Sequence, residues 1–284
     1  AATPRQHKTA IDRLMILIRQ VHRWLPERLV VLVVDGGYAA VKLALVCAET
    51  PNLALVTRLR WDASLYHPPP PGTGQRGPAP SKGARQRGLK QWAARRDTPW
   101  EEVEVAWYGG HKKKLQLFAR TARWYTPGEA PVAIRYVIAR DPDGRLRDEV
   151  FACTKLDATP AQIIEWVVMR WSVETTFEEA REHLGLETQR QWSDLAIART
   201  TPCLLGLFSL VVLLTQRLQP DGQVPVLTAA WYEKPEATFS DCLVLVRKHL
   251  WRSLHYVNSA PQAESVSFPA SAWEHWLSCL AGAA

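Results

Sequence analysis

The apolar positions of the first sixty residues predict alternating helices and strands. From Ile11 to Leu25 they recur at helical spacing, and Pro26 ends the run. Residues 28–34 are a continuous Leu- and Val-rich run, which is typical of a strand buried on both faces. An Ala-, Leu- and Val-rich segment up to Glu49 predicts a second helix, and residues 53–60 predict a second strand. This order is typical of an α/β fold.

The middle of the chain predicts strands and the last third predicts helices. Strands are expected near 103–108 and 114–125, followed by a hairpin of 132–140 and 145–153 closed by the turn 141–144. Thr159 and Gln162 form a capping box around Pro160, which predicts a helix start. Helices are expected from Glu187 to about residue 254, with a new start near Phe239, and a short apolar segment covers 273–280.

Composition is that of a chain able to bury a sizeable core. Of the 284 residues, 47% are hydrophobic and 22% are charged, which suits one large or two modest domains. The five cysteines lie far apart without metal-finger spacing and are interpreted as reduced core thiols of a cytoplasmic protein. The longest apolar run, 204–214, is too short to span a bilayer, so no membrane partner is expected.

The positive charge of the chain lies in one region. Residues 76–123 hold twelve basic and four acidic residues, a net +8 against +7 for the whole chain. A Pro-rich arm opens this region at His67, and aromatic residues alternate with the lysines after it. The region is either a solvated basic loop or a DNA-binding surface that neutralises phosphates and stacks on bases. The DNA-binding candidates are Arg58, Arg60, Arg76, Lys82, Arg85, Arg87, Lys112, Lys113, Lys114 and Trp124.

Two carboxylates stand out from their surroundings. Asp35, followed by two glycines, comes directly after the apolar strand, where open α/β sheets place their ligands, although an Asp here could also cap a helix. Glu174 shares a predicted helix face with apolar residues and with Arg170 and Arg181. Its alternative interpretation is a structural ion pair with Arg170, four residues before it.

The two segments together resemble the DDE transposases of bacterial insertion sequences. Asp35 in VVDGGYA is similar to the second Asp of that family, and Glu174 in RWSVETTFEEAREHLGLE is similar to its Glu. Arg170 and Glu174 match the Tyr-Arg-Glu-Lys motif of the family, whereas Val167 replaces the Tyr and Arg181 the Lys. Further similarity lies in TRLRWDASLY (57–66), RGPAPSKG (76–83), RDPDGRL (140–146) and ARTTPCLLGLFSLVVLL (198–214).

The resemblance implies an RNase H-like fold and a metal-dependent reaction on DNA. In that family three carboxylates hold two Mg²⁺ or Mn²⁺ ions, which clamp the attacking and leaving oxygens of a phosphodiester. Asp35 and Glu174 would be two of these catalytic and metal-binding residues, with Arg170 and Arg181 in support. The first Asp of the family lies on a strand before the first helix. Neither Asp12 nor Glu27 occupies such a position, so two ions are expected only in a complete site.

We therefore expect an N-terminally truncated transposase catalytic domain that lacks its first three strands. Its parts would be a partial core (1–60), the basic arm with a β-rich insertion (61–158), the Glu helix with C-terminal helices (159–257) and a tail (258–284). The expected partners are double-stranded DNA, as transposon ends and target, and a second copy in the intact enzyme, at the nucleoid. The alternatives are a non-catalytic DNA-binding remnant and a metal-dependent nuclease that does not transpose.

Overall fold

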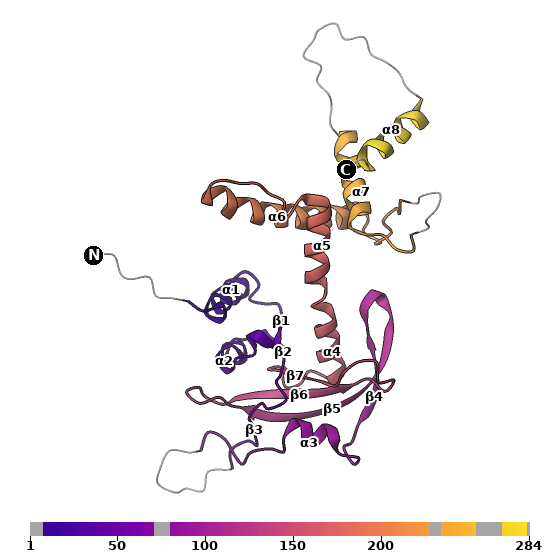
Figure 1. Cartoon of the computed structure of the whole chain (residues 1–284). Coiled ribbons are helices and arrows are strands. Elements are labelled where there is room, and N and C mark those ends of the chain that lie inside the picture. Colours follow the sequence, from indigo (N-terminus) through magenta and orange to yellow (C-terminus); the bar gives the residue numbers. More distant parts are fainter. Residues whose placement is uncertain (1–7, 71–79, 228–233, 254–268, 283–284) are drawn as a thin grey trace, which may run out of the picture. The chain divides into compact units, whose positions relative to one another are not determined.

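The computed structural model describes residues 8–70, 80–227, 234–253 and 269–282. The chain divides into two compact units, residues 1–171 and 172–284 (Figure 1). The first contains all seven strands. Its elements are α1 (Ala10–Trp24), β1 (Val30–Val34), a 3₁₀ turn η1 (Gly36–Tyr38), α2 (Val41–Glu49), β2 (Leu53–Arg58), β3 (Leu65–Tyr66), α3 (Leu89–Ala94), β4 (Glu101–Ala106), a second 3₁₀ turn η2 (Tyr108–Gly110), β5 (Lys112–Trp124), β6 (Val132–Arg140), β7 (Glu149–Cys153) and α4 (Pro160–Met169).

The seven strands form one open, mostly antiparallel sheet. Its order is β1-β2-β7-β6-β5-β3, and β4 pairs with β5 beside this path. β1 and β2 are parallel, and the other pairings are antiparallel. The predicted α/β class is confirmed. Because β2 pairs with β7, strands from both sides of residue 60 belong to the same sheet. The proposed domain boundaries stay a prediction.

Apolar side chains cover both faces of the sheet. On one face, residues of α1, α2 and α3 pack with Leu55, Ile134 and Tyr136 in one core. On the other face, α4 packs through Ile163 and Ile164 in a second core. Figure 1 shows α3 and α4 on opposite sides of the β5–β6 ribbon. The sheet is therefore the middle layer of the first unit.

β1 contributes apolar side chains to both cores although it lies at the edge of the sheet. Val30, Leu32 and Val34 pack against the core of α1 and α2, whereas Val31 and Val33 pack against the core of α4. This alternation confirms the predicted two-sided strand. All five residues nevertheless keep some exposure, because β1 has only β2 beside it among the described strands.

The basic region contains structure that its composition did not predict. The arm lies partly outside the described residues, which include neither 71–79 nor its Arg76. Its two ends are joined, because the N–H of His67 donates to Ala84 (2.8 Å) and the N–H of Gly83 donates to His67 (2.9 Å). A Cβ at Gly83 would lie 2.4 Å from the carbonyl oxygen of Pro68, so this close crossing needs glycine. After it, α3 places Leu89 in the core.

The prediction of one continuous helix that carries Arg170 and Glu174 on the same face is wrong, because the helix is interrupted. α4 ends at Met169, and α5 (Ser172–Leu184) begins three residues later. The N–H of Trp171 donates to Val168, three residues back (3.1 Å), a tight bond of the kind that ends helices. The boundary between the two units falls at this turn.

The second unit is helical. It contains α5, α6 (Asp194–Leu218), α7 (Phe239–Ser253) and α8 (Ala270–Gly282). Val211 of α6 packs with Phe239, Leu243 and Val246 of α7. The predicted start near Phe239 is confirmed. The segment assigned to the tail holds α8, which is longer than the predicted 273–280 and buries Leu277.

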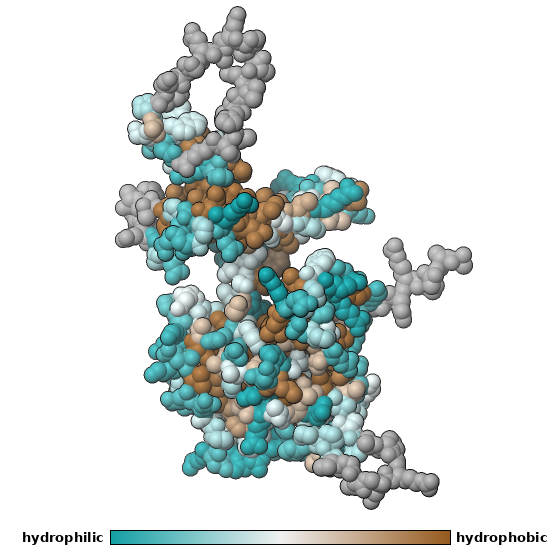
Figure 2. All heavy atoms as spheres, turned by 180° about the vertical axis from the view of Figure 1, so that it is seen from behind, coloured by the Kyte–Doolittle hydropathy of each residue, from teal (hydrophilic) through white to brown (hydrophobic). Residues whose placement is uncertain are grey.

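α6 presents an apolar surface within its unit. Leu210 and Leu213 are 57% and 60% exposed, and apolar residues gather on the surface of the helical unit (Figure 2). By length and composition α6 is the one described helix that could cross a membrane. The expected absence of a membrane partner stays a prediction.

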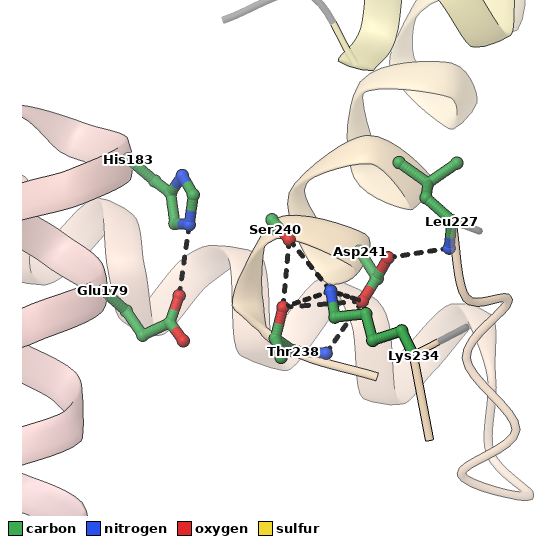
Figure 3. A network of polar contacts seen from close by, with 7 residues as sticks. All are labelled: Glu179, His183, Leu227, Lys234, Thr238, Ser240 and Asp241. Atoms are coloured by element: carbon green, nitrogen blue, oxygen red, sulfur yellow. Dashed lines mark hydrogen bonds and ion pairs between the residues drawn. The ribbon is translucent and has the colours of Figure 1, made fainter. Parts of the chain in front are cut away.

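A buried ion pair organises the start of α7 (Figure 3). The carboxylate of Asp241 accepts hydrogen bonds from Lys234 Nζ (2.6 Å) and from the N–H groups of Leu227 (2.9 Å) and Thr238 (2.8 Å). Burial raises the pKa of Asp241, but these donors outweigh it and hold the pKa below its ordinary value. This carboxylate therefore joins the chain before α7 to the first turn of α7.

We predict that the main-chain amides of β1 exchange with solvent in alternation. In a parallel pair each residue directs its N–H and C=O to the same side, and Val30 donates to Asn52 of the β2 side (2.8 Å). Leu32 and Val34 should therefore exchange at least about tenfold more slowly than Val31 and Val33 in hydrogen-exchange NMR. Equal protection of all four amides would show that a further strand pairs with β1.

Asp241→Asn should destabilise the helical unit by roughly 1–3 kcal/mol at pH 7, because Lys234 loses its charged partner. The lowered pKa means that the carboxylate stabilises the fold above about pH 4 and loses this effect as the pH falls through the folded-state pKa. The difference between the two proteins in denaturant unfolding should therefore shrink below pH 4. Asp221→Asn, at an exposed carboxylate, is the matched control. A pH-independent difference would contradict this account.

Candidate active site at the carboxyl end of β1 and β2

Asp35 follows β1 directly and occupies the N-cap position of η1. It precedes η1, yet its carboxylate makes no capping hydrogen bond, and α2 begins only at Val41 after Ala40. The side-chain capping bond that the alternative of a helix-cap Asp requires is therefore not made. The main chain of Asp35 is fixed instead, because its carbonyl accepts from Tyr38 N–H (2.9 Å) and from Thr57 Oγ1 (3.3 Å). The side chain is 66% exposed.

A small pocket of about 80 Å³ lies beside Asp35. Its lining brings two carboxylates, Asp35 and Glu149, together with two guanidinium groups, Arg58 and Arg170. Arg170 Nη2 lies 3.8 Å from Asp35 Oδ1, and Arg58 Nη2 lies 2.9 Å from Glu149 Oε1. Each acid thus faces an arginine, and the pocket is close to charge balance.

Glu149 is a carboxylate that the sequence analysis missed. It begins β7, and the antiparallel pairing of β2 with β7 brings it to the end of β2, where Leu59 N–H donates to Val150 (2.8 Å). Its neighbours Asp143 and Asp148 belong to the same acidic and basic hairpin, so no local pattern sets Glu149 apart. Only the strand pairing identifies it.

The described carboxylates do not by themselves make a metal centre. Divalent ions such as Mg²⁺ take hard oxygen ligands, a requirement that Asp35 meets. No group of three His, Cys, Asp or Glu side chains is arranged to hold an ion anywhere in the described ranges. Within the pocket, Glu149 is held by Arg58. The carboxylate oxygens of Asp35 are suitable ligands for a divalent ion. The pocket nevertheless has too few carboxylates without an arginine partner for a two-metal site.

Glu174 and Arg181 lie in the second unit, on α5. Glu174 is in the first turn of α5 and Arg181 in the last. Arg181 donates two hydrogen bonds to Glu187, at 2.6 and 3.2 Å, and this carboxylate holds the pKa of the guanidinium above its ordinary value. A role of Arg181 toward a substrate phosphate would require it to leave Glu187. The convergence of Asp35 with Glu174 stays a prediction.

The first unit matches a family model described as DDE superfamily endonuclease, over residues 1–152. The match covers more than half of the chain. The chain belongs to this family. No curated protein matches it. The open, mostly antiparallel sheet with its helices is consistent with an RNase H-like DDE fold, and members of the family typically act on DNA with divalent metals.

The matched range includes Asp35 and Glu149 and ends before Glu174. The likeness at Glu174 therefore rests on the helix motif alone, whereas Asp35 lies within the matched range and at the carboxyl end of β1. The roles of both residues as metal ligands stay predictions.

Several candidate DNA-binding residues of the domain are engaged in ion pairs. Arg60 holds Asp62 through two hydrogen bonds (2.9 and 2.7 Å), and Lys112 lies 3.1 Å from Glu104. Lys113 lies 3.1 Å from the buried Asp141, whose pKa is raised by burial but lowered overall by Lys113 and backbone donors. Lys113 thus contributes to the fold. Arg58 is the fourth paired candidate.

The prediction that Trp124 stacks on DNA bases is wrong. Its side chain is 6% exposed, because the pairing of β5 with β3 and β6 places it in the core beside Val132. The burial period of β5 could have revealed this, since Ala122 and Trp124 share an inward face.

Lys82 packs its ammonium group against two aromatic rings. Its ammonium lies 3.0 Å from the ring centroid of Tyr125 and 4.4 Å from that of Tyr66. Arg85, whose exposed side chain has no carboxylate partner in the described part of the chain, pairs through its backbone with Tyr66. Both therefore lie where the two ends of the basic arm meet.

Two exposed arginines share one indole. The guanidinium carbons of Arg87 and Arg120 lie 4.9 and 4.4 Å from the ring centroid of Trp92. Among the described residues neither has a carboxylate partner, and Lys114 likewise has none. A guanidinium ordered over an aromatic ring keeps its donors for other groups, such as phosphates. The sequence analysis included Arg87 but missed Arg120.

We predict that unpaired cations carry more of the DNA binding than paired ones. Arg87→Ala with Arg120→Ala should reduce the salt slope of duplex binding by about 2, or roughly 0.9 for each lost phosphate contact. Lys155→Ala with Lys112→Ala removes the same charge from residues paired with Asp157 and Glu104, and should change the slope by less than half as much. Salt titration of fluorescence anisotropy measures both. Equal changes in slope for the two double variants would show that DNA binding depends on total charge and not on the cations over Trp92.

Proposed function

We propose that this chain is the catalytic part of an insertion-sequence transposase, which cleaves DNA at transposon ends and joins them to a target. The observation that carries the proposal is the family match across residues 1–152, which includes an exposed Asp35 at the carboxyl end of β1. Asp35 and Glu174 are proposed as metal ligands, and the active form as a dimer on paired ends. Mg²⁺ or Mn²⁺ would supply charge stabilisation at the reacting phosphate.

The residues of the chain have separate roles in this proposal. Asp35 would hold the ion with hard oxygens, and Arg170 would keep the carboxylate oriented and then face the substrate phosphate. Arg58 and Glu149 would fix the floor of the pocket through their 2.9 Å pair. The cations without carboxylate partners would hold the DNA backbone.

A second candidate is a DNA-binding protein without catalytic activity. It is favoured by the arginine that faces each carboxylate of the Asp35 pocket and by the lack of a three-acid cluster in the described ranges. Such a protein would bind DNA independently of divalent metal, and Asp35 would serve only as a partner of Arg170.

Mn²⁺ binding to the DNA complex distinguishes the two candidates. If Asp35 and Glu174 hold the same ion, Asp35→Ala and Glu174→Ala should each weaken Mn²⁺ binding by about tenfold or more, and the double variant should lose little further affinity. Electron paramagnetic resonance of free Mn²⁺ measures this, and Asp62→Ala is the control at a nearby exposed carboxylate.

Plasmid nicking in Mn²⁺ adds the functional readout. Under the proposed function any nicking should disappear in Asp35→Ala and persist in Asp62→Ala. Additive losses of Mn²⁺ affinity, or an effect no larger than that of Asp62→Ala, would contradict a shared ion. Duplex binding that is indifferent to Mn²⁺ and to Asp35→Ala would favour the non-catalytic candidate.

A further inference from the structure

An exposed cysteine and an exposed histidine meet on α8. The interpretation of all five cysteines as core thiols is wrong for Cys203 and Cys279, which are exposed. Cys279 Sγ lies 3.7 Å from Nε2 of His275, a residue one helical turn before it and also exposed. Residues four apart share one face of a helix, so α8 itself holds the two side chains together. The pair lies outside the candidate active site and has no role in the proposed function.

The distance between these two atoms suits two ligands of one zinc ion. Zn²⁺ binds thiolate sulfur at about 2.3 Å and imidazole nitrogen at about 2.0–2.1 Å in a tetrahedral arrangement, which places the two ligand atoms about 3.6 Å apart. The observed separation of 3.7 Å is close to this value, so Cys279 and His275 can bind one ion without a change in the helix. Zinc sites on helices use two side chains at the same spacing of four residues.

Two ligands make only half of a tetrahedral site. Among the residues that the structure describes, no three His, Cys, Asp or Glu side chains are grouped to hold an ion. A second copy supplies the same two ligands when two α8 helices meet about a two-fold axis, because such a contact brings a surface against itself. Each Cys279 thiol then gives its proton to solvent, and the two thiolates balance the charge of the ion between two neutral imidazoles.

The outer face of α8 is suited to contact with a second copy. Leu277 and Ala281 are buried, so one face of the helix packs inside its own unit. Trp276 and Leu280, each directly after a member of the ligand pair, are 50% and 57% exposed. They too lie four residues apart and form an apolar stripe beside the pair. Burial of this stripe would add a hydrophobic contribution to the metal bonds.

We propose that His275 and Cys279 of two copies of this chain bind one Zn²⁺ and join the copies through α8. Thiolate and imidazole ligands select zinc, whereas Mg²⁺ and Mn²⁺ favour oxygen ligands. The site therefore differs in its metal from the Asp35 pocket, and it forms without DNA.

Co²⁺ in place of Zn²⁺ tests the ligands in the full chain without DNA. With a phosphine reductant to keep the thiols reduced, the titration should give a thiolate-to-Co²⁺ charge-transfer band and the intense visible bands of tetrahedral Co²⁺, saturating at one ion for each pair of chains. Cys279→Ser should remove the charge-transfer band. His275→Ala should weaken Co²⁺ binding at least about tenfold, because even indirect partners of a bound metal contribute that much.

The matched control, Cys203→Ser with His111→Ala, removes the same residue types from exposed positions and should leave the titration unchanged. Sedimentation equilibrium of the same samples tests the second copy. Zn²⁺ should strengthen self-association at least about tenfold, since it binds the dimer and not the separate chains. A chelator should reverse this effect, and Cys279→Ser should remove it.

Two results would overturn the shared zinc site. One is a charge-transfer band that saturates at one ion per chain while the chain stays monomeric. The other is self-association that is the same with Zn²⁺, with chelator and in Cys279→Ser. Neither result bears on Asp35 or on plasmid nicking, so the proposed function is tested separately.

Discussion

The parallel register of β1 on β2 is the constraint on which the candidate site depends. Val34 lies opposite Thr57, so Asp35 and Arg58 leave the sheet at the same edge. The hydroxyl of Thr57 also donates to the carbonyl of Asp35. β7 then pairs with β2 in the antiparallel sense and brings Glu149 to this edge. A slip of one residue would exchange the faces of β1, so the residues that now pack in one core would face the other, and the carbonyl of Asp35 would lose its place opposite Thr57. The register therefore fixes the site.

The attraction between Asp35 and Arg170 at this edge of the sheet is weak enough for a ligand to displace it. The side chain of Asp35 is 66% exposed and lies 3.8 Å from Arg170, so water screens their attraction. Exposed pairs of this kind contribute about 0–1 kcal/mol, which a divalent ion or a phosphate can readily outweigh. The Arg58–Glu149 pair is closer, at 2.9 Å, and the side chain of Glu149 is 36% exposed against 66% for Asp35, so Glu149 is better suited to shape the pocket than to exchange ligands. This difference separates a carboxylate available for metal from one that supports the site.

The sequence predicted those features that follow from local patterns. The β1 run, the Pro26 stop, the 141–144 turn and the capping box at Thr159 each depend on neighbouring residues, and the structure has an element at each place. The features that the sequence analysis missed depend on contacts distant along the chain. Trp124 is buried where Leu65 of β3, fifty-nine residues away along the chain, pairs with it, and Glu149 reaches the site only through β2. The composition of the basic arm concealed α3, whose single buried Leu89 is a weak periodic signal.

The same distinction applies to charge. The sequence located the basic region correctly as a cluster, but it could not assign partners, because Lys113 meets Asp141 across twenty-eight residues. Free cations such as Arg87 and Arg120 are identified only once the paired ones are known. The prediction for Glu174 depends on the most distant contact, because it requires Glu174 of the second unit to hold the same ion as Asp35 of the first.

The most direct test of the central claim is the position of Mn²⁺ in crystals of the chain bound to DNA, located by anomalous scattering. The account predicts an ion about 2.1 Å from a carboxylate oxygen of Asp35 and from one of Glu174. An ion bound elsewhere, or one bound by Asp35 while Glu174 faces solvent, would contradict it.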